Sequence, residues 1–346
     1  MQILITGHCG YIGRVATRQA LQAGHQVVGL DAEYFGGEPF THAKLRQMRG
    51  DIRDVQADDL RGVDAIIHLA ALSNDPMGAL NPGLTEAINR DASLRLARLA
   101  KSVGIGRFVF ASSCSIYGVD AADGGLLDES ARFQPVSAYA RSKVETEAGL
   151  GALADDAFSP VYMRNATAFG VGPSPRFDLV VNNLAGGAWC DGRILVMSDG
   201  TPWRPLVHIE DIAQAALCAA VAPRQAVHNQ AFNIGCDDAN YQVHAIAALV
   251  AQAFPEASLS ITGAAGPDPR SYRVSFTKAL TGLPGFAPRW TLAAGIAEVA
   301  SFLRSGGLKG LRFDDPHFIR LKALNAAMVM GELDPDLRWT RAPLAT

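Results

Sequence analysis

The chain has 346 residues, of which 49% are hydrophobic and 19% are charged, and its net charge is -3. These values predict a globular protein with one large domain and an appendage, or with two domains, and they argue against nucleic acid as a partner. No apolar run reaches about 18 residues and no charged leader opens the chain, so we expect neither a membrane span nor a signal peptide. The five cysteines are scattered and the eight histidines lack metal spacing, which is typical of reduced thiols in a cytoplasmic protein without a metal site.

The first predicted elements are a short buried strand at residues 2–6 and a helix at residues 11–23, joined by a glycine-rich turn. Gly7, Gly10 and Gly13 allow a tight turn and a close approach of backbone to a ligand. The N-terminus of the helix then offers N–H groups and a positive dipole end to a pyrophosphate. The spacing G-x-x-G-x-x-G departs from the standard dinucleotide fingerprint, so this turn alone is also compatible with a plain strand-to-helix connection.

The second predicted strand, residues 26–30, ends at Asp31. This acid follows Gly13 at close to the spacing of about 20 residues at which a carboxylate binds the adenosine ribose. A carboxylate there accepts hydrogen bonds from both ribose hydroxyls and repels a 2′-phosphate, so Asp31 favours NAD over NADP. Two further strand-like stretches end at Asp51-Ile52, near the expected adenine edge, and at Leu69-Ala70-Ala71, where small residues would let a cofactor lie against the backbone.

A helix predicted at residues 137–153 carries Tyr139 and Lys143, which are four positions apart and therefore lie on one face. An ammonium beside a phenol favours the phenolate, so we expect the pKa of Tyr139 to fall below its usual value of about 10. Such a pair can exchange a proton with a hydroxyl while a hydride moves to or from a nicotinamide. This spacing also arises by chance, and the alternative is an exposed helix pair without chemistry.

Taken together and in this order, the motifs resemble the extended short-chain dehydrogenase/reductase superfamily, particularly its NAD-dependent nucleotide-sugar epimerase/dehydratase branch. The resemblance covers roughly residues 1–305. It rests on the glycine turn, Asp31, Asp51-Ile52, His68-Leu-Ala-Ala71, Ser112-Ser-Cys-Ser-Ile-Tyr-Gly118, Tyr139-x-x-x-Lys143 and Arg164-Asn-Ala-Thr167. It implies a fold of the α/β class, a Rossmann-type doubly wound parallel sheet with a smaller C-terminal α/β substrate-binding lobe.

The resemblance also implies the residues of the site. The catalytic group would be Ser113, Tyr139 and Lys143, with Ser113 sharing the substrate oxygen with Tyr139. The NAD site would comprise Gly7, Gly10, Tyr11, Ile12, Gly13, Asp31, Asp51, Ile52, Leu69, Ala70, Ala71, Asn89, Ser112, Tyr139 and Lys143. A nucleotide-diphosphate sugar would meet Ser73, Asn74, Asn165, Asn183, Arg204 and Arg270. A guanidinium matches phosphate geometry, whereas the alternative for each arginine is a surface salt bridge.

The organisation of the chain follows from the same resemblance. The expected units are a cofactor-binding domain at 1–170 with added segments near 205–236, a substrate lobe mainly at 171–311, and a C-terminal helical extension at 312–346. Four apolar side chains of the extension have the spacing of helical packing onto the body, namely Phe318, Leu321, Leu324 and Leu333. Many relatives pair their subunits through helices that correspond to residues 84–103 and 137–153, so a homodimer is expected.

The residues that follow Ser113 separate the possible reactions. Dehydratases of this branch carry an Asp-Glu pair there, whereas this chain has Cys114 and Ser115, which disfavours dehydration. Some epimerising relatives use a cysteine one position further along, so Cys114 is either structural or an acid/base group. Because Asp31 favours NAD, which epimerases keep and recycle, we predict a nucleotide-sugar epimerase acting through a transient 4-keto sugar. The alternatives are a 4-keto-sugar reductase of deoxysugar biosynthesis, a sugar decarboxylase, and a non-catalytic dinucleotide-binding sensor.

Overall fold

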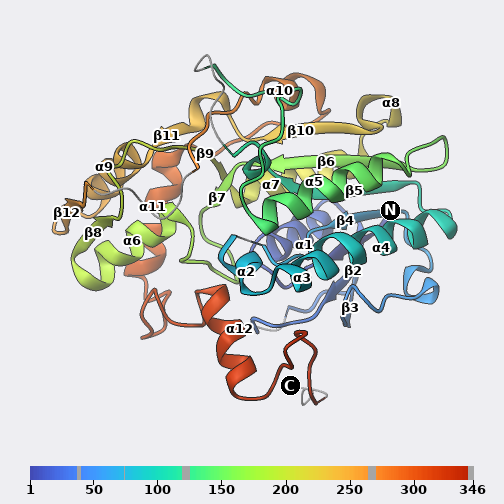
Figure 1. The fold of residues 1–346 in the computed structure, drawn as a ribbon, viewed down its shortest axis with the longest axis horizontal. Helices are drawn as coiled ribbons and strands as arrows, with labels where there is room; N and C mark the ends of the chain where they lie inside the picture. The colour runs from blue at the N-terminus through green and yellow to red at the C-terminus, as the bar shows by residue number, and fades with distance from the viewer. Residues whose placement is uncertain (37–39, 74, 119–124, 264–269, 342–346) are drawn as a thin grey trace.

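The computed structural model describes residues 1–36, 40–73, 75–118, 125–263 and 270–341. Seven parallel strands form its central sheet, in the order β3-β2-β1-β4-β5-β6-β10 (Figure 1). The strands are β1 (Gln2–Thr6), β2 (Gln26–Asp31), β3 (Leu45–Arg49), β4 (Ala65–His68), β5 (Arg107–Ser113), β6 (Ser159–Asn165) and β10 (Gln230–Ile234). The first six follow the order of a doubly wound dinucleotide-binding sheet, which confirms the predicted Rossmann-type class. The order reverses between β1 and β4, where such sheets open a crevice for ligands.

Helices cover both faces of this sheet because its strands are apolar on both sides. Ile3 and Val109 belong to the core on one face, whereas Leu4 and Phe108 belong to the core on the other. The first face is covered by α1 (Gly13–Gln22), α7 (Ile209–Val221), α8 (Arg224–Val227) and α10 (Thr277–Gly282). The second face is covered by η1 (Ala57–Leu60), α2 (Asp75–Leu80), α3 (Pro82–Thr85), η2 (Glu86–Ala92), α4 (Ser93–Ser102) and α5 (Ala138–Gly151). The single helix predicted at 84–103 is therefore α3 and α4 joined by η2, a π-helical turn.

The remaining strands build a smaller lobe beside the sheet, on the left of the view in Figure 1. It holds a three-stranded sheet in the order β11-β9-β7 and a parallel pair of β8 and β12. Its elements are β7 (Thr167–Phe169), α6 (Val180–Asp191), β8 (Arg193–Val196), β9 (Trp203–His208), β11 (Asn240–Gln242), α9 (Val243–Ala253), β12 (Ser258–Ile261) and α11 (Leu292–Arg304). Two single turns, η3 (Cys114–Ile116) and η4 (Asp237–Ala239), complete the described elements. The chain thus crosses between the two bodies, since β9 lies in the lobe and β10 lies beside β6.

The C-terminal extension forms α12 (Arg320–Val329) and a following loop, drawn at the bottom of Figure 1. Leu324 and Leu333 are buried in the core of the α4 face, with Leu321 packed at its edge, and Phe318 is buried in the core of the lobe. The four side chains therefore pack onto the body as predicted, but only Leu321 and Leu324 do so from a helix, because Phe318 precedes α12 and Leu333 follows it. The extension contacts both bodies of the protein at once.

Two further observations concern the class of protein. Within the described ranges, no helix combines the length and the apolar character needed to cross a membrane. All five cysteines are free thiols, as the sequence predicted.

Candidate active site

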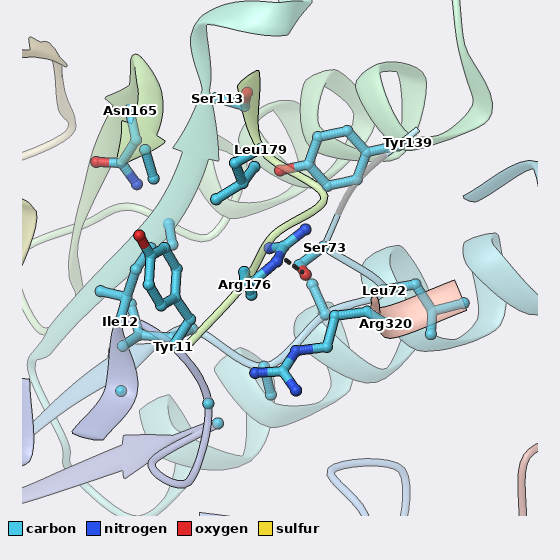
Figure 2. Close-up of a pocket in the computed structure, with 18 of the residues that line it drawn as sticks. Tyr11, Ile12, Leu72, Ser73, Ser113, Tyr139, Asn165, Arg176, Leu179 and Arg320 are labelled. Atoms are coloured by element: carbon cyan, nitrogen blue, oxygen red, sulfur yellow. Dashed lines mark hydrogen bonds between the residues drawn. The ribbon is translucent and has the colours of Figure 1, made fainter. Parts of the chain in front are cut away.

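A cleft of about 620 Å³ crosses the carboxyl ends of β1 to β6 and continues into the lobe (Figure 2). Of the predicted site residues that the structure describes, all except Asn89 line this cleft. Asn74 lies outside the described residues. The motifs are far apart in sequence, and the parallel sheet brings them together because each follows the carboxyl end of a strand or begins a helix there.

The glycine turn fits a pyrophosphate because the backbone leaves no space for side chains. Gly7 has a φ of 73°, and a Cβ on it would lie 2.9 Å from the backbone nitrogen of Ala70. A Cβ on Gly13 would lie 1.9 Å from the carbonyl oxygen of Gly7. The turn therefore closes directly against the end of β4 and presents the N-terminus of α1 to the cleft, where a phosphate is favoured.

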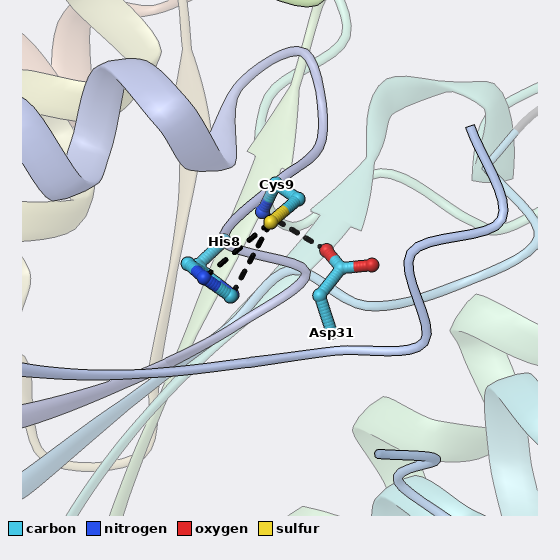
Figure 3. Close-up of side chains that lie close together, drawn as sticks. All are labelled: His8, Cys9 and Asp31. Atoms are coloured by element: carbon cyan, nitrogen blue, oxygen red, sulfur yellow. Dashed lines mark hydrogen bonds between the residues drawn. The ribbon is translucent and has the colours of Figure 1, made fainter. Parts of the chain in front are cut away.

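Asp31 lies at the far end of the cleft from Tyr139 and is held by the backbone. One carboxylate oxygen accepts the Cys9 N–H at 3.0 Å and the other accepts the Glu33 N–H at 2.7 Å. His8, Cys9 and Asp31 also bring possible metal ligands within 4.8 Å of one another (Figure 3). Burial and then the charge of Asp31 raise the pKa of Cys9 to about 12, so the free thiol stays protonated near neutral pH. The absence of a metal site stays a prediction.

Tyr139, Lys143 and Ser113 meet at the opposite end of the cleft. Ser137 caps α5 by accepting the Ala140 N–H, which places Tyr139 in the first turn of the helix. The ammonium of Lys143 donates to the carbonyl of Ala111 at 2.7 Å and lies 5.6 Å from the centroid of the Tyr139 ring. Figure 2 shows the phenol pointing into the cleft, on the side of Ser113. The arrangement offers a substrate oxygen two hydroxyl partners.

The expected fall in the pKa of Tyr139 does not occur in this structure. Burial and then the charge of Asp75 raise the pKa of Tyr139 to about 12, and hydrogen bonding with Ser113 opposes them only in part. Burial also lowers the pKa of Lys143 to about 7, although Glu147 acts in the other direction. The prediction was wrong because it counted the charge of the lysine but not the cost of taking both groups out of water.

This burial gives a testable pH dependence of stability. Lys143 loses its proton near pH 10.5 in the unfolded chain but near pH 7 in the folded protein. Between these values the unfolded chain binds more protons, so the free energy of unfolding rises with pH, and this gain is lost as the pH falls to 7. We expect the free energy of unfolding of the wild type to rise relative to Lys143→Met between pH 7 and about pH 9. Urea unfolding of NAD-free protein measures it. Lys44→Met, at an exposed lysine, is the matched control: it keeps Lys143, so its free energy of unfolding should run parallel to that of the wild type over this pH range.

Two predicted cofactor residues use their side chains elsewhere. The amide of Asn89 bonds to the N–H of Leu72 at 2.8 Å, to its carbonyl at 3.1 Å and to Ser142 at 3.2 Å, and Asn89 is 1% exposed. Asn89 thus braces the chain after β4 and does not line the cleft, so its predicted place in the cofactor site stays a prediction. Ser112 does line the cleft, and its hydroxyl donates to Glu147 at 2.5 Å.

The predicted substrate residues gather where the cleft enters the lobe. Arg270 forms an ion pair with Asp75, and Arg204 donates to the carbonyl of Arg270. Asn183 donates to the carbonyl of Phe177 at 2.9 Å. The side-chain oxygen of Asn165 is buried without a hydrogen-bond partner, so it is available to a ligand in the cleft.

Sequence reasoning missed two arginines that line the cleft, Arg176 and Arg320. Arg176 is 7% exposed, forms a bidentate pair with Asp178 and donates to Ser73 at 3.2 Å (Figure 2). In the sequence, the only nearby hint of its function is an acid two positions later, Asp178, with which it forms the ion pair. Arg320 comes from the C-terminal extension, far from every motif in the sequence.

The doubly wound sheet, the glycine turn and the tyrosine–lysine pair define a nicotinamide-dependent enzyme of the short-chain dehydrogenase/reductase type. The model of the NAD dependent epimerase/dehydratase family matches residues 3–235. The chain therefore belongs to the NAD-dependent epimerase/dehydratase family, and its cofactor is NAD.

Relatives of known structure or function agree with this assignment. A UDP-glucose 4-epimerase from Mycolicibacterium smegmatis is 30% identical over 325 residues, which are 88% of this chain and 99% of the relative. Another from Lactobacillus helveticus is 27% identical over 255 residues, 68% of this chain and 76% of the relative. Among solved structures, MoeE5 in complex with UDP-glucuronic acid and NAD is 25% identical with a TM-score of 0.78, covering 88% of this chain and 100% of MoeE5. TunA, an NAD-dependent NDP-hexosamine 5,6-dehydratase, has the same TM-score at 24% identity, with 88% and 98% covered, and this likeness concerns the fold alone.

Proposed function

We propose that this enzyme is a nucleotide-sugar epimerase that oxidises C4 of the sugar to a transient ketone and reduces it from the other face. Relatives named UDP-glucose 4-epimerase, and a structural neighbour that binds UDP-glucuronic acid, support a UDP-hexose or UDP-hexuronate as substrate. The proposal depends most on one feature, the residues that stand after Ser113.

Neither residue after Ser113 is suited to the acid/base step of a dehydration. Cys114 is 0% exposed, donates to the carbonyl of Arg164 and does not line the cleft, and burial raises the pKa of its thiol. Ser115 lines the cleft but carries a hydroxyl that stays protonated near neutral pH. The carboxylates of Asp75 and Asp178 at this end of the cleft are already paired with Arg270 and Arg176. This arrangement favours oxidation and reduction at one carbon without loss of water.

The three catalytic residues suffice for that cycle. Ser113 and Tyr139 would hold the oxygen on C4, and Tyr139 would take its proton as C4 loses a hydride. Because burial within the protein raises the pKa of Tyr139 to about 12, this step requires that the positive charge of bound NAD lower that pKa and favour the phenolate. NAD, when bound, accepts that hydride at its nicotinamide ring and returns it later. Once the 4-keto sugar has rotated to present its other face to the nicotinamide, Tyr139 would give the proton back to the same oxygen. Lys143 would support the phenolate from the next turn of α5 and bond to the nicotinamide ribose.

Two arginines where the cleft enters the lobe support a substrate that binds through its diphosphate group. Arg204 and Arg270 lie there together, and a guanidinium binds phosphate oxygens in a bidentate manner. In this proposal Asn183 and the unpartnered oxygen of Asn165 orient the nucleotide sugar, and Ser73 borders it. Pairing into a homodimer through η2, α4 and α5, and the proposed unit boundaries near residues 170 and 311, stay predictions.

The test is an assay of purified enzyme with UDP-glucose, UDP-N-acetylglucosamine and UDP-glucuronic acid, with products separated by chromatography. We expect one of them to form its C4 epimer without added cofactor and without net change of absorbance at 340 nm. Net consumption of NADH with a 4-keto sugar would identify the reductase instead. Release of carbon dioxide from the hexuronate would identify a decarboxylase. Protein that binds NAD but converts none of these sugars would contradict the proposal.

A further inference from the structure

Arg320 is a buried cation in the C-terminal extension. It is 2% exposed, and among the described residues no carboxylate forms an ion pair with it. Its guanidinium donates to the carbonyl and hydroxyl of Ser174, at 3.0 Å and 2.6 Å, and lies 4.4 Å over the ring of Phe35. An arginine cannot give up its charge near neutral pH, so burying it without an anion costs free energy. The position therefore calls for an anionic ligand.

The groups around Arg320 do not neutralise it by direct contact. The charges of Arg176, Asp178 and Asp31 all act on Arg320. Asp178 is held in a bidentate pair with Arg176, and the two oxygens of Asp31 accept backbone N–H groups. The two acids equal the two arginines in number, but among the described residues neither acid forms an ion pair with Arg320.

The position of Arg320 along the cleft identifies the anion. Arg320 lines the same cleft as the glycine turn, and Figure 2 shows it in the same part of the cleft as Arg176. Its neighbours Phe35 and Asp31 belong to the adenosine end, whereas Tyr139 and Lys143 mark the nicotinamide end. In a dinucleotide the group between two riboses is the pyrophosphate. We propose that Arg320, supplied by the C-terminal extension, binds the pyrophosphate of NAD opposite the glycine turn.

Other residues of the extension hydrogen-bond to the cofactor-binding domain and so hold the segment that carries Arg320 in place. Tyr34 donates to the carbonyl of Leu337 at 2.6 Å, and Trp339 donates to the carbonyl of Ala32 at 2.7 Å. Arg53 bridges Asp51 and the carbonyl of Asp336. These contacts lie directly after β2 and β3, beside the adenosine end. The extension, which no motif explained, thereby becomes a part of the cofactor site and helps to retain NAD between turnovers.

The experiment compares Arg320→Gln with Arg312→Gln in full-length protein freed of nucleotide. Arg312 lies on the same extension with 57% of its side chain exposed, so it is the matched control. Calorimetric titration with NAD and, separately, with UDP distinguishes the pyrophosphate of the cofactor from the diphosphate of a substrate. Loss of a charge-assisted hydrogen bond should raise the Kd for NAD by about 10- to 100-fold, whereas the Kd for UDP should not change. Arg312→Gln should leave both constants unchanged.

The stability of the nucleotide-free protein provides a second readout. Because Arg320 is buried and forms no ion pair with the described acids, Arg320→Gln should melt at the same temperature as the wild type or higher, while the additional stabilisation by NAD shrinks. Weaker binding of UDP alone would assign Arg320 to the substrate and overturn the proposal. Unchanged binding of NAD by Arg320→Gln would also overturn it. The same is true if NAD and UDP both bind more weakly by the same factor and the variant melts at a lower temperature than the wild type. None of these outcomes depends on which sugar the enzyme converts, so a failure of the proposed epimerase activity leaves this test intact.

Discussion

Replacement of Tyr139 by phenylalanine is expected to lower kcat on the true nucleotide-sugar substrate by about 10²- to 10⁴-fold, the usual contribution of a positioned acid/base group. The substitution removes one oxygen and leaves the ring in place against the cleft. NAD binding and the melting temperature should therefore be preserved, because the ring keeps its packing and only the hydroxyl is removed. Steady-state rates of epimer formation measure the effect.

Tyr241→Phe is the matched control for this experiment. Tyr241 lies on β11 in the lobe, partly exposed and away from the cleft lining, so the same chemical change there should leave kcat unchanged. A Tyr139→Phe enzyme with near wild-type kcat would show that Tyr139 is not the acid/base group. Loss of NAD from this variant would instead point to a structural function of the phenol.

Replacement of Gly13 by alanine is expected to abolish retention of NAD by the purified protein. The new Cβ would lie 1.9 Å from the carbonyl oxygen of Gly7 and 2.8 Å from the Cα of His8, and both are backbone atoms that cannot rotate away. The turn must open to accommodate it, which moves the N-terminus of α1 away from the phosphate position. Overpacking of this kind also costs about 1–3 kcal/mol or more in free energy of unfolding. Nucleotide content after purification and urea unfolding measure the two effects.

Gly282→Ala tests whether any added methyl has this consequence. A Cβ on Gly282, at the end of α10, would meet only the ring of Phe232 at 3.8 Å, an ordinary contact. That variant should bind NAD normally and unfold at the same urea concentration as the wild type. A Gly13→Ala protein that still copurifies with NAD would refute the close fit of the turn to the cofactor.

If Arg320 binds the pyrophosphate, cofactor retention and reaction type are linked. An enzyme that returns its hydride to the same sugar has no need to release NAD, and a buried arginine on a fastened extension would slow release. An enzyme that consumes NADH in each turnover would have to release its cofactor every time. The measured retention of NAD by the wild type therefore also bears on which of the proposed reactions it performs.

Local patterns in the sequence predicted the parts of this protein that depend on neighbouring residues. The glycine turn, the acid at the end of β2 and the tyrosine–lysine pair on α5 are each confined to short segments, because backbone geometry and helical spacing determine them. The apolar runs likewise predicted the strands of the parallel sheet. Their order along the chain then predicted that they meet at the carboxyl ends of the strands, and the cleft brings them together there.

Only the tertiary structure decided properties that depend on burial and on distant partners. The pKa of Tyr139 rises instead of falling because desolvation exceeds the nearby charges, and no spacing in the sequence encodes desolvation. Asn89 turned out to brace Leu72 because a π-helical turn buries it. Arg320 reaches the cleft from a segment without motifs, since packing of the extension onto two cores carries it there. The sequence by itself thus determined the family and the cofactor and supplied the proposed catalytic residues, whereas long-range packing decided which groups of the site are buried and which of its charges are paired.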